Sequence, residues 1–144
     1  MATTTATVSI SSSDLMPGSN LSINASSTLM KAGLTTGLTQ IRTGVIDLPT
    51  GTEFRIGPLA TETSGSVHDI GSYLYLCNTS TDDTYWIDFG IHETMMGRLY
   101  AGDWMFIPWN ASDDAAELEI EANTGTNGIE WAFFSSNTLL PTAA

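Results

Sequence analysis

The sequence predicts an all-β fold: an antiparallel β-sandwich or jelly roll with an extended N-terminal arm. Strand-length runs follow one another after residue 70, apolar residues recur in them at alternate positions, and turn residues separate them. No amphipathic helix pattern lies between these runs, which favours two antiparallel sheets over a parallel sheet covered by helices. A length of 144 residues fits one domain that buries about two thirds of its unfolded surface.

The first forty residues differ in composition from the rest of the chain. They contain two charged residues and no aromatic residue, whereas 12 of the 13 aromatic residues lie after residue 70. Alternation predicts a short strand over Thr7–Ser13 and a second over Leu21–Ser27, with a turn between them. We assign residues 1–20 to an extended arm that contacts a partner, and residues 21–144 to a single β-sandwich domain.

The segment from Thr28 to Asp47 mixes two signals. Its apolar spacing is partly helical, but each of its three glycines weakens a helix by about 1 kcal/mol relative to alanine. We therefore expect at most a single helical turn within a crossing loop. Strand fragments follow over Gly44–Leu48 and Glu53–Ile56, with a Pro-Thr-Gly turn between them.

The second half of the chain predicts a meander of five strands. Their ranges are Ser72–Asn78, Tyr85–Ile91, Gly102–Trp109, Ala116–Asn123 and Gly128–Ser135. Strict alternation of acids and apolar residues in Glu117–Ala122 indicates one wet and one buried face. Gly102 would adopt positive φ and Asp103 would cap amides in the turn before the third strand. Pro108 has no amide donor, so that strand should end or lie at an edge there.

Composition and charge exclude several classes of partner. The chain has 16 acids against 4 bases, a net charge of −12, and its bases are scattered rather than clustered. Binding to a phosphate backbone requires clustered Lys and Arg, so we expect no nucleic-acid partner. No apolar run reaches about 18 residues, so we expect no membrane partner. Cys77 has no second cysteine, and the first residues do not resemble an export signal, so we expect synthesis in a reducing compartment.

Catalytic and metal-binding patterns are weak. His68 and His92 both lie outside a nucleophile elbow, and no second histidine is spaced from His92 as a zinc helix requires. The pairs Asp82–Asp83 and Asp113–Asp114 do not follow EF-hand spacing; solvated turns are the favoured interpretation, and calcium binding is the alternative. We expect no enzymatic activity, no cofactor and no metal site.

The large aromatic residues supply the candidate interaction site. The strands that contain them carry apolar residues on both faces, and each apolar face must pack against another part of the protein or against a partner. A sandwich of 144 residues can hardly provide both covers by itself. We therefore name Trp86, Trp104, Phe106 and Trp109 as candidate interface residues. Packing in the domain core is the competing and favoured interpretation for the tryptophans as a group, and a platform for sugar rings is the third.

Several stretches carry a resemblance to a known class of proteins. Leu74–Ser80 is a strand that ends in Asn-Thr-Ser, and it precedes the Leu-Tyr-Ala-Gly-Asp turn of Leu99–Asp103 and the aromatic-Pro strand Trp104–Trp109. These segments, together with the front segments Ser12–Leu15 and Ser27–Leu38, resemble small virion structural proteins of tailed bacteriophages, especially marine phages. The resemblance covers most of the chain.

This resemblance implies a β-sandwich protein of the phage head, a capsid decoration or cement protein that binds and stabilises the shell. Its partners would be the major capsid protein and further copies of itself, as a homotrimer. It would be assembled in the host cytoplasm and lie on the exterior of the capsid. The alternative is a tail-associated or fibre-associated domain that binds a carbohydrate or receptor.

Overall fold

The computed structural model describes residues 4–29, 40–57, 71–110, 118–135 and 142–143. These ranges hold strands and turns, and none of them contains a helix that could cross a membrane. The strands are β1 (Thr5–Met16), β2 (Ser19–Thr28), β3 (Gln40–Pro49), β4 (Glu53–Gly57), β5 (Gly71–Asn78), β6 (Trp86–Ile91), β7 (Thr94–Tyr100), β8 (Trp104–Asn110), β9 (Leu118–Ala122), β10 (Thr126–Ser135) and β11 (Thr142–Ala143).

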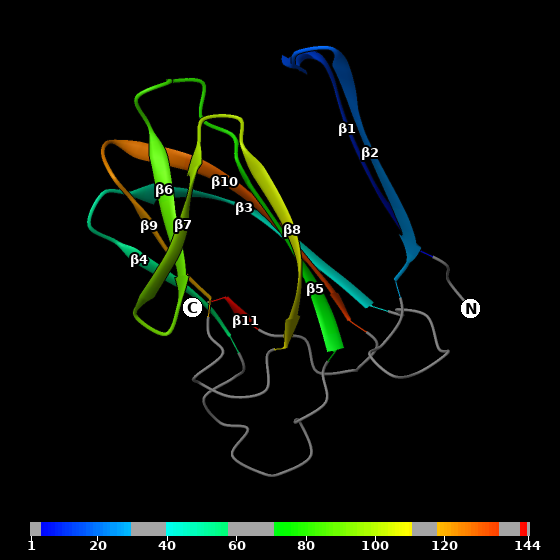
Figure 1. The fold of residues 1–144 in the computed structure, drawn as a ribbon. Coiled ribbons are helices and arrows are strands. Elements are labelled where there is room, and N and C mark those ends of the chain that lie inside the picture. Colours follow the sequence, from blue (N-terminus) through cyan, green and yellow to red (C-terminus); the bar gives the residue numbers. More distant parts are fainter. Residues whose placement is uncertain (1–3, 30–39, 58–70, 111–117, 136–141, 144) are drawn as a thin grey trace.

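Two antiparallel sheets pack face to face as a sandwich (Figure 1). The four-stranded sheet has the order β3-β10-β5-β8, and the five-stranded sheet has the order β11-β4-β9-β6-β7. The chain passes from one sheet to the other after every strand of the sandwich from β3 to β10 except β6. This alternation produces the two interlocking Greek keys of a jelly roll. The predicted all-β sandwich or jelly roll is confirmed.

The local predictions hold better than the predicted connectivity. Each of the five runs expected after residue 70 is a strand whose bounds lie within a few residues of the expected ones. The meander is wrong, because β5 pairs with β8 and β10, and β6 pairs with β7 and β9. Turn residues mark where a strand ends, whereas burial of apolar faces decides which strand it pairs with. Thr94–Tyr100 was not predicted as a strand, since its Met-Met-Gly-Arg sequence does not alternate.

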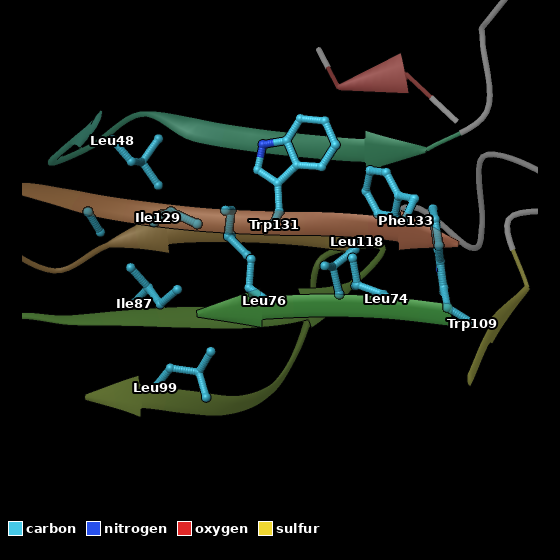
Figure 2. Close-up of a cluster of buried hydrophobic side chains, with 12 residues drawn as sticks. Leu48, Leu74, Leu76, Ile87, Leu99, Trp109, Leu118, Ile129, Trp131 and Phe133 are labelled. Carbon is cyan, nitrogen blue, oxygen red and sulfur yellow. The ribbon is translucent and has the colours of Figure 1, made fainter. Parts of the chain in front are cut away.

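The core lies between the two sheets, where each strand contributes every second side chain. Figure 2 shows its labelled members reaching inward from both layers. From the four-stranded sheet come Leu48, Leu74, Leu76, Trp109, Ile129, Trp131 and Phe133, and from the five-stranded sheet come Ile87, Leu99, Leu118, Ile120 and Ala122. Burying one such large apolar side chain is worth about 1.5–3 kcal/mol relative to leaving it exposed.

The N-terminal strands stand apart from this sandwich. β1 and β2 pair with each other as a separate two-stranded antiparallel sheet, which projects from the sandwich in Figure 1. The boundary placed after residue 20 falls inside β2, so residues 21–28 continue the hairpin and do not pair with the sandwich sheets. The single helical turn expected after Thr28 falls mainly on residues 30–39, which lie outside the described residues.

The indole ring of Trp131 in β10 packs directly on Gly44 in β3. Gly44 lies opposite Trp131 in the register of β3 and β10, and a Cβ added at Gly44 would overlap the indole ring. We expect Gly44→Ala to lower the free energy of unfolding by about 1–3 kcal/mol, as overpacking does elsewhere. Urea denaturation followed by tryptophan fluorescence measures this loss.

The neighbouring position supplies the control for this substitution. Thr43 is exposed on the outer side of the same strand, so Thr43→Ala should change the unfolding free energy by less than about 0.5 kcal/mol. Equal stability of the Gly44→Ala variant and the unmodified protein would contradict the packing described here.

Candidate functional site

Trp109 belongs to the core and not to a surface. Its side chain is 5 % exposed, and its ring centroid lies 5.4 Å from that of Phe133. Along β8, Trp109 shares the inward face with Met105 and Ile107, which pack against the buried cluster. A partner outside the sandwich could not reach this ring. Trp109 is therefore removed from the candidate interface.

Trp86 lies on the outer face of the five-stranded sheet and is half-buried there. The guanidinium carbon of Arg98 sits 4.4 Å from the centroid of its ring, and the Tyr100 ring lies 6.1 Å away at 60°. Arg98 is held in place by Asp88, through Nε to Oδ1 at 2.7 Å and Nη2 to Oδ2 at 3.3 Å. The hydrogen bond to Asp88 is the main cause that raises the pKa of Arg98. A cation therefore already stacks on the ring of Trp86.

Trp104 and Phe106 lie on the outer face of the other sheet, the four-stranded one. Trp104 is 54 % exposed. The ring of Phe106 stacks on that of Tyr73, with centroids 5.5 Å apart and planes 5° apart, and meets the edge of Phe134 at 6.2 Å. Trp86 and Trp104 thus face outward from opposite sides of the sandwich. They do not form one platform, although each lies on a surface.

The outer face of the four-stranded sheet is apolar over all four strands. The register places the same alternate positions of β3, β10, β5 and β8 side by side on it. We call this surface the apolar outer face; its apolar members are Ile41, Val45, Tyr73, Tyr75, Cys77, Trp104, Phe106, Pro108, Ala132 and Phe134, and Thr43 is a polar residue among them. Among the described residues, Asp47 and Glu130 are its charged positions.

The pKa of Tyr75 reflects its position on the apolar outer face. Desolvation raises the pKa of Tyr75 to about 12, and Cys77 and Glu130 beside it add to the rise. A raised tyrosine pKa means that the neutral hydroxyl is favoured, as expected where water is partly excluded. The apolar character predicted for both faces of β8 is therefore observed, and it continues across β5 and β10.

A buried amide joins the two sheets at one end of the sandwich. Asn78, at the end of β5, is fully buried. Its Nδ2 donates to the carbonyl of Leu99 in β7 at 3.1 Å and to that of Tyr85 at 3.5 Å. Its Oδ1 accepts from the amide of Ser80 at 3.1 Å. This single side chain thus holds the end of one sheet, a loop and a strand of the other sheet.

The backbone of Asn78 binds the turn between β7 and β8. Its amide donates to the carbonyl of Asp103 at 3.0 Å, and its carbonyl accepts from the amide of Gly102 at 2.8 Å. Gly102 has φ of +81°, and Asp103 Oδ2 accepts from the amide of Tyr100 at 3.0 Å, so both predicted turn roles are confirmed. The Asn-Thr-Ser strand end and the Leu-Tyr-Ala-Gly-Asp turn are therefore two halves of one hydrogen-bonded unit. The edge position predicted from Pro108 is also confirmed, since β8 borders its sheet.

The acids of β9 depart from the sequence interpretation at one position. Glu121 is exposed, as expected, but Glu119 is 8 % exposed and its Oε2 accepts from the amide of Glu93 at 2.7 Å. His92 and Glu93 both have positive φ, which is the geometry of a tight hairpin turn. Glu119 therefore fixes the turn between β6 and β7. A hollow of about 230 Å³ beside this turn has four glutamates in its lining, including Glu53.

The residues weighed for catalysis and metal binding do not assemble into a site in the described part of the chain. Within those ranges, no three His, Cys, Asp or Glu side chains are grouped as metal ligands. Asp82 accepts from the amide and hydroxyl of Thr84 at 2.9 and 2.6 Å, and these bonds lower its pKa. His92 is exposed in its turn. His68 and the pair Asp113–Asp114 lie outside the described residues.

Comparison with known proteins finds a likeness of structure and none of sequence. No family model and no curated protein matches the chain. A solved structure, the cupin domain of Cnp3 from Schizosaccharomyces pombe, is similar with 12 % sequence identity and a TM-score of 0.40, over 92 % of this chain and 85 % of that chain.

Replacing Asn78 by aspartate should make the unfolding free energy of the protein depend on pH. In the Asn78→Asp variant, an ionised carboxylate could not donate to the two carbonyls and would face them with a negative charge. We expect a loss of about 3 kcal/mol or more of unfolding free energy at pH 7. Burial raises the pKa of the introduced carboxyl above its unfolded value, so the folded state binds more protons than the unfolded state. The deficit should therefore shrink as pH falls from 8 to 5 and grow as pH rises.

Urea denaturation over this pH range measures the deficit. Asn24→Asp is the matched control, because Asn24 is exposed on the hairpin and the change in charge is the same. Its effect should stay within about 0.5 kcal/mol at each pH. A pH-independent deficit in the Asn78→Asp variant would contradict the proton linkage.

Proposed function

We propose that this chain is a structural protein of a tailed-bacteriophage virion, a decoration protein that binds and stabilises the head shell, and that it is not an enzyme. The observation that carries the proposal is the apolar outer face. Val45 is 71 % exposed on it, Ile41 58 % and Trp104 54 %. An apolar surface that extends over four strands is a typical mark of a protein interaction site.

Two further features support an assembly role. The segments that resemble small phage virion proteins, Leu74–Ser80 and Leu99–Asp103, meet in the buried hydrogen-bonded unit around Asn78. Jelly rolls also recur among viral capsid proteins, which is support by analogy of fold. The proposed partners are the major capsid protein and further copies of this chain, as a trimer. The proposed location is the capsid exterior, after assembly in the host cytoplasm.

The alternative is a tail or fibre domain that binds a carbohydrate or receptor. Sugar binding of the usual kind needs flat aromatic faces that are open and close together. Trp109 and Trp131 are buried, Arg98 stacks on Trp86, and Trp104 lies on the opposite side of the sandwich from Trp86. The arrangement of the tryptophans therefore favours the decoration protein.

Binding to isolated head shells tests the proposal. We expect the purified chain to co-sediment with empty shells of the phage that encodes it and to saturate at a fixed ratio to the capsid protein. A ligand that binds only the assembled shell also stabilises it, so the midpoint of thermal shell disruption should rise with the concentration of the chain. An unrelated acidic protein of similar mass is the control.

Two other results would contradict the proposed function. Absence of binding to shells, together with saturable binding on a glycan array, would support the fibre domain. Turnover on an ester, peptide or glycoside panel that is lost in the His92→Ala variant would contradict the non-enzymatic assignment.

A further inference from the structure

The N-terminal hairpin has one polar and one apolar face. In its register Val8 lies opposite Ala25 and Ile10 lies opposite Ile23. We call this side of the hairpin the apolar hairpin face; its apolar members are Ala6, Val8, Ile10, Leu21, Ile23 and Ala25, and Ser12 and Ser27 lie at its two ends.

On the other face of the hairpin, polar side chains form hydrogen bonds with one another. Ser9 Oγ donates to Asn24 Oδ1 at 2.8 Å, Asn24 Nδ2 donates to Ser22 Oγ at 3.1 Å, and the hydroxyls of Thr7 and Ser26 lie 3.2 Å apart. The polar face therefore has partners within the hairpin and is suited to contact with water.

The apolar hairpin face is left exposed by its own chain. Ile10 is 50 % exposed and Ile23 is 47 % exposed. An isolated two-stranded hairpin is at best marginally stable in water, and it needs an apolar surface to pack on. Among the described strands, β1 and β2 pair only with each other.

The apolar outer face is the matching surface on the same molecule. The described part of the hairpin carries one charged residue, Asp14, and the apolar outer face carries Asp47 and Glu130. The whole chain has 16 acids. Two copies can thus meet through these surfaces with little of the like-charge repulsion that a net charge of −12 creates elsewhere.

The dimensions also fit. Strands spaced about 4.8 Å apart and rising about 3.3 Å per residue give a ten-residue hairpin a footprint of roughly 300 Å². The four-stranded sheet is wide enough to receive both strands. Each such contact would bury roughly 300 Å² on each partner, less than the 800 Å² or so per partner of a standard interface, and a copy that also receives a hairpin from another neighbour would be held by two such contacts.

We infer that the hairpin β1–β2 of one copy packs its apolar face on the apolar outer face of a neighbouring copy, so that the copies close into a ring. The contact joins two different surfaces, and a contact of this kind closes into a ring when the rotation between copies permits it. The inference rests on one part of the proposed function, the self-association of the chain. It names the two surfaces through which the copies associate. Three copies are expected, in line with the proposed trimer.

Sedimentation velocity of the full chain with paired substitutions tests the inference. Ile10→Asp places a charge on the apolar hairpin face, and Ser11→Asp places the same charge on its polar face. Val45→Glu changes the apolar outer face, and Met96→Glu changes an exposed position, 59 % accessible, in the other sheet. Burying an unpaired carboxylate is costly, so the first member of each pair should raise the concentration for half-association by about tenfold or more, and the second should leave it unchanged.

Mixing of two variants identifies the contact directly. One chain carries Ile10→Cys and the other Val45→Cys, both with Cys77→Ser, and a short bismaleimide should link the two chains to each other. Replacing Ile10→Cys by Ser11→Cys should abolish this product. Far-UV circular dichroism and the urea midpoint of each variant show that it remains folded.

Each other outcome overturns the inference. A monomer at all concentrations would indicate that the hairpin covers its own sheet. Dissociation by Val45→Glu but not by Ile10→Asp would indicate packing of sheet against sheet. Binding to head shells is measured separately: a ring that ignores shells contradicts the proposed decoration role alone, and a monomer that binds shells contradicts this inference alone.

Discussion

The buried side chain of Asn78 is the contact on which one whole end of the sandwich depends. A polar side chain without solvent access must satisfy its groups within the protein, and Asn78 does so with three backbone groups, two in the loop after β5 and one in β7. Because its own amide and carbonyl also bind the turn at Gly102 and Asp103, the end of β5, the loop after it and the β7–β8 turn are fixed together. The crossing between the sheets is therefore held by these bonds at this point.

The two sheets of the sandwich differ in what they present to the outside. The five-stranded sheet carries the charged residues Asp88, Arg98 and Glu121 outward, beside exposed apolar positions such as Met96 and Tyr100, so its outer face is mixed. The four-stranded sheet carries aromatic and aliphatic side chains on both faces. Its inner face builds the core, and its outer face leaves apolar side chains partly exposed. The strands β5, β8 and β10 therefore contribute to the core on one side and supply the surface of the proposed association on the other.

A feature of this fold could be predicted from the sequence when the residues that determine it lie close together in the chain. Alternation of side chains is local, so the positions of the later strands and the turn at Gly102 could be predicted. The partner of each strand depends on residues far away in the chain, which explains the wrong meander. A local signal separates Trp109 from Trp104 and Phe106. Along β8 it occupies the other set of alternate positions, so its side chain lies on the opposite face of the strand. Which of the two apolar faces turns inward is decided only by pairing with β5, where Leu74 and Leu76 are buried.

The pairing of β3 with β10 has a consequence for the order of events during synthesis. Pro49 at the end of β3 pairs with Thr126 at the start of β10, which leaves the ribosome more than seventy residues later. At about 5–20 residues per second, β3 waits for its neighbour for roughly 4–15 s. The hairpin β1–β2 joins strands that are adjacent in sequence and closes in about 1–10 μs. On the nascent chain, the hairpin is therefore complete long before the four-stranded sheet of the same chain.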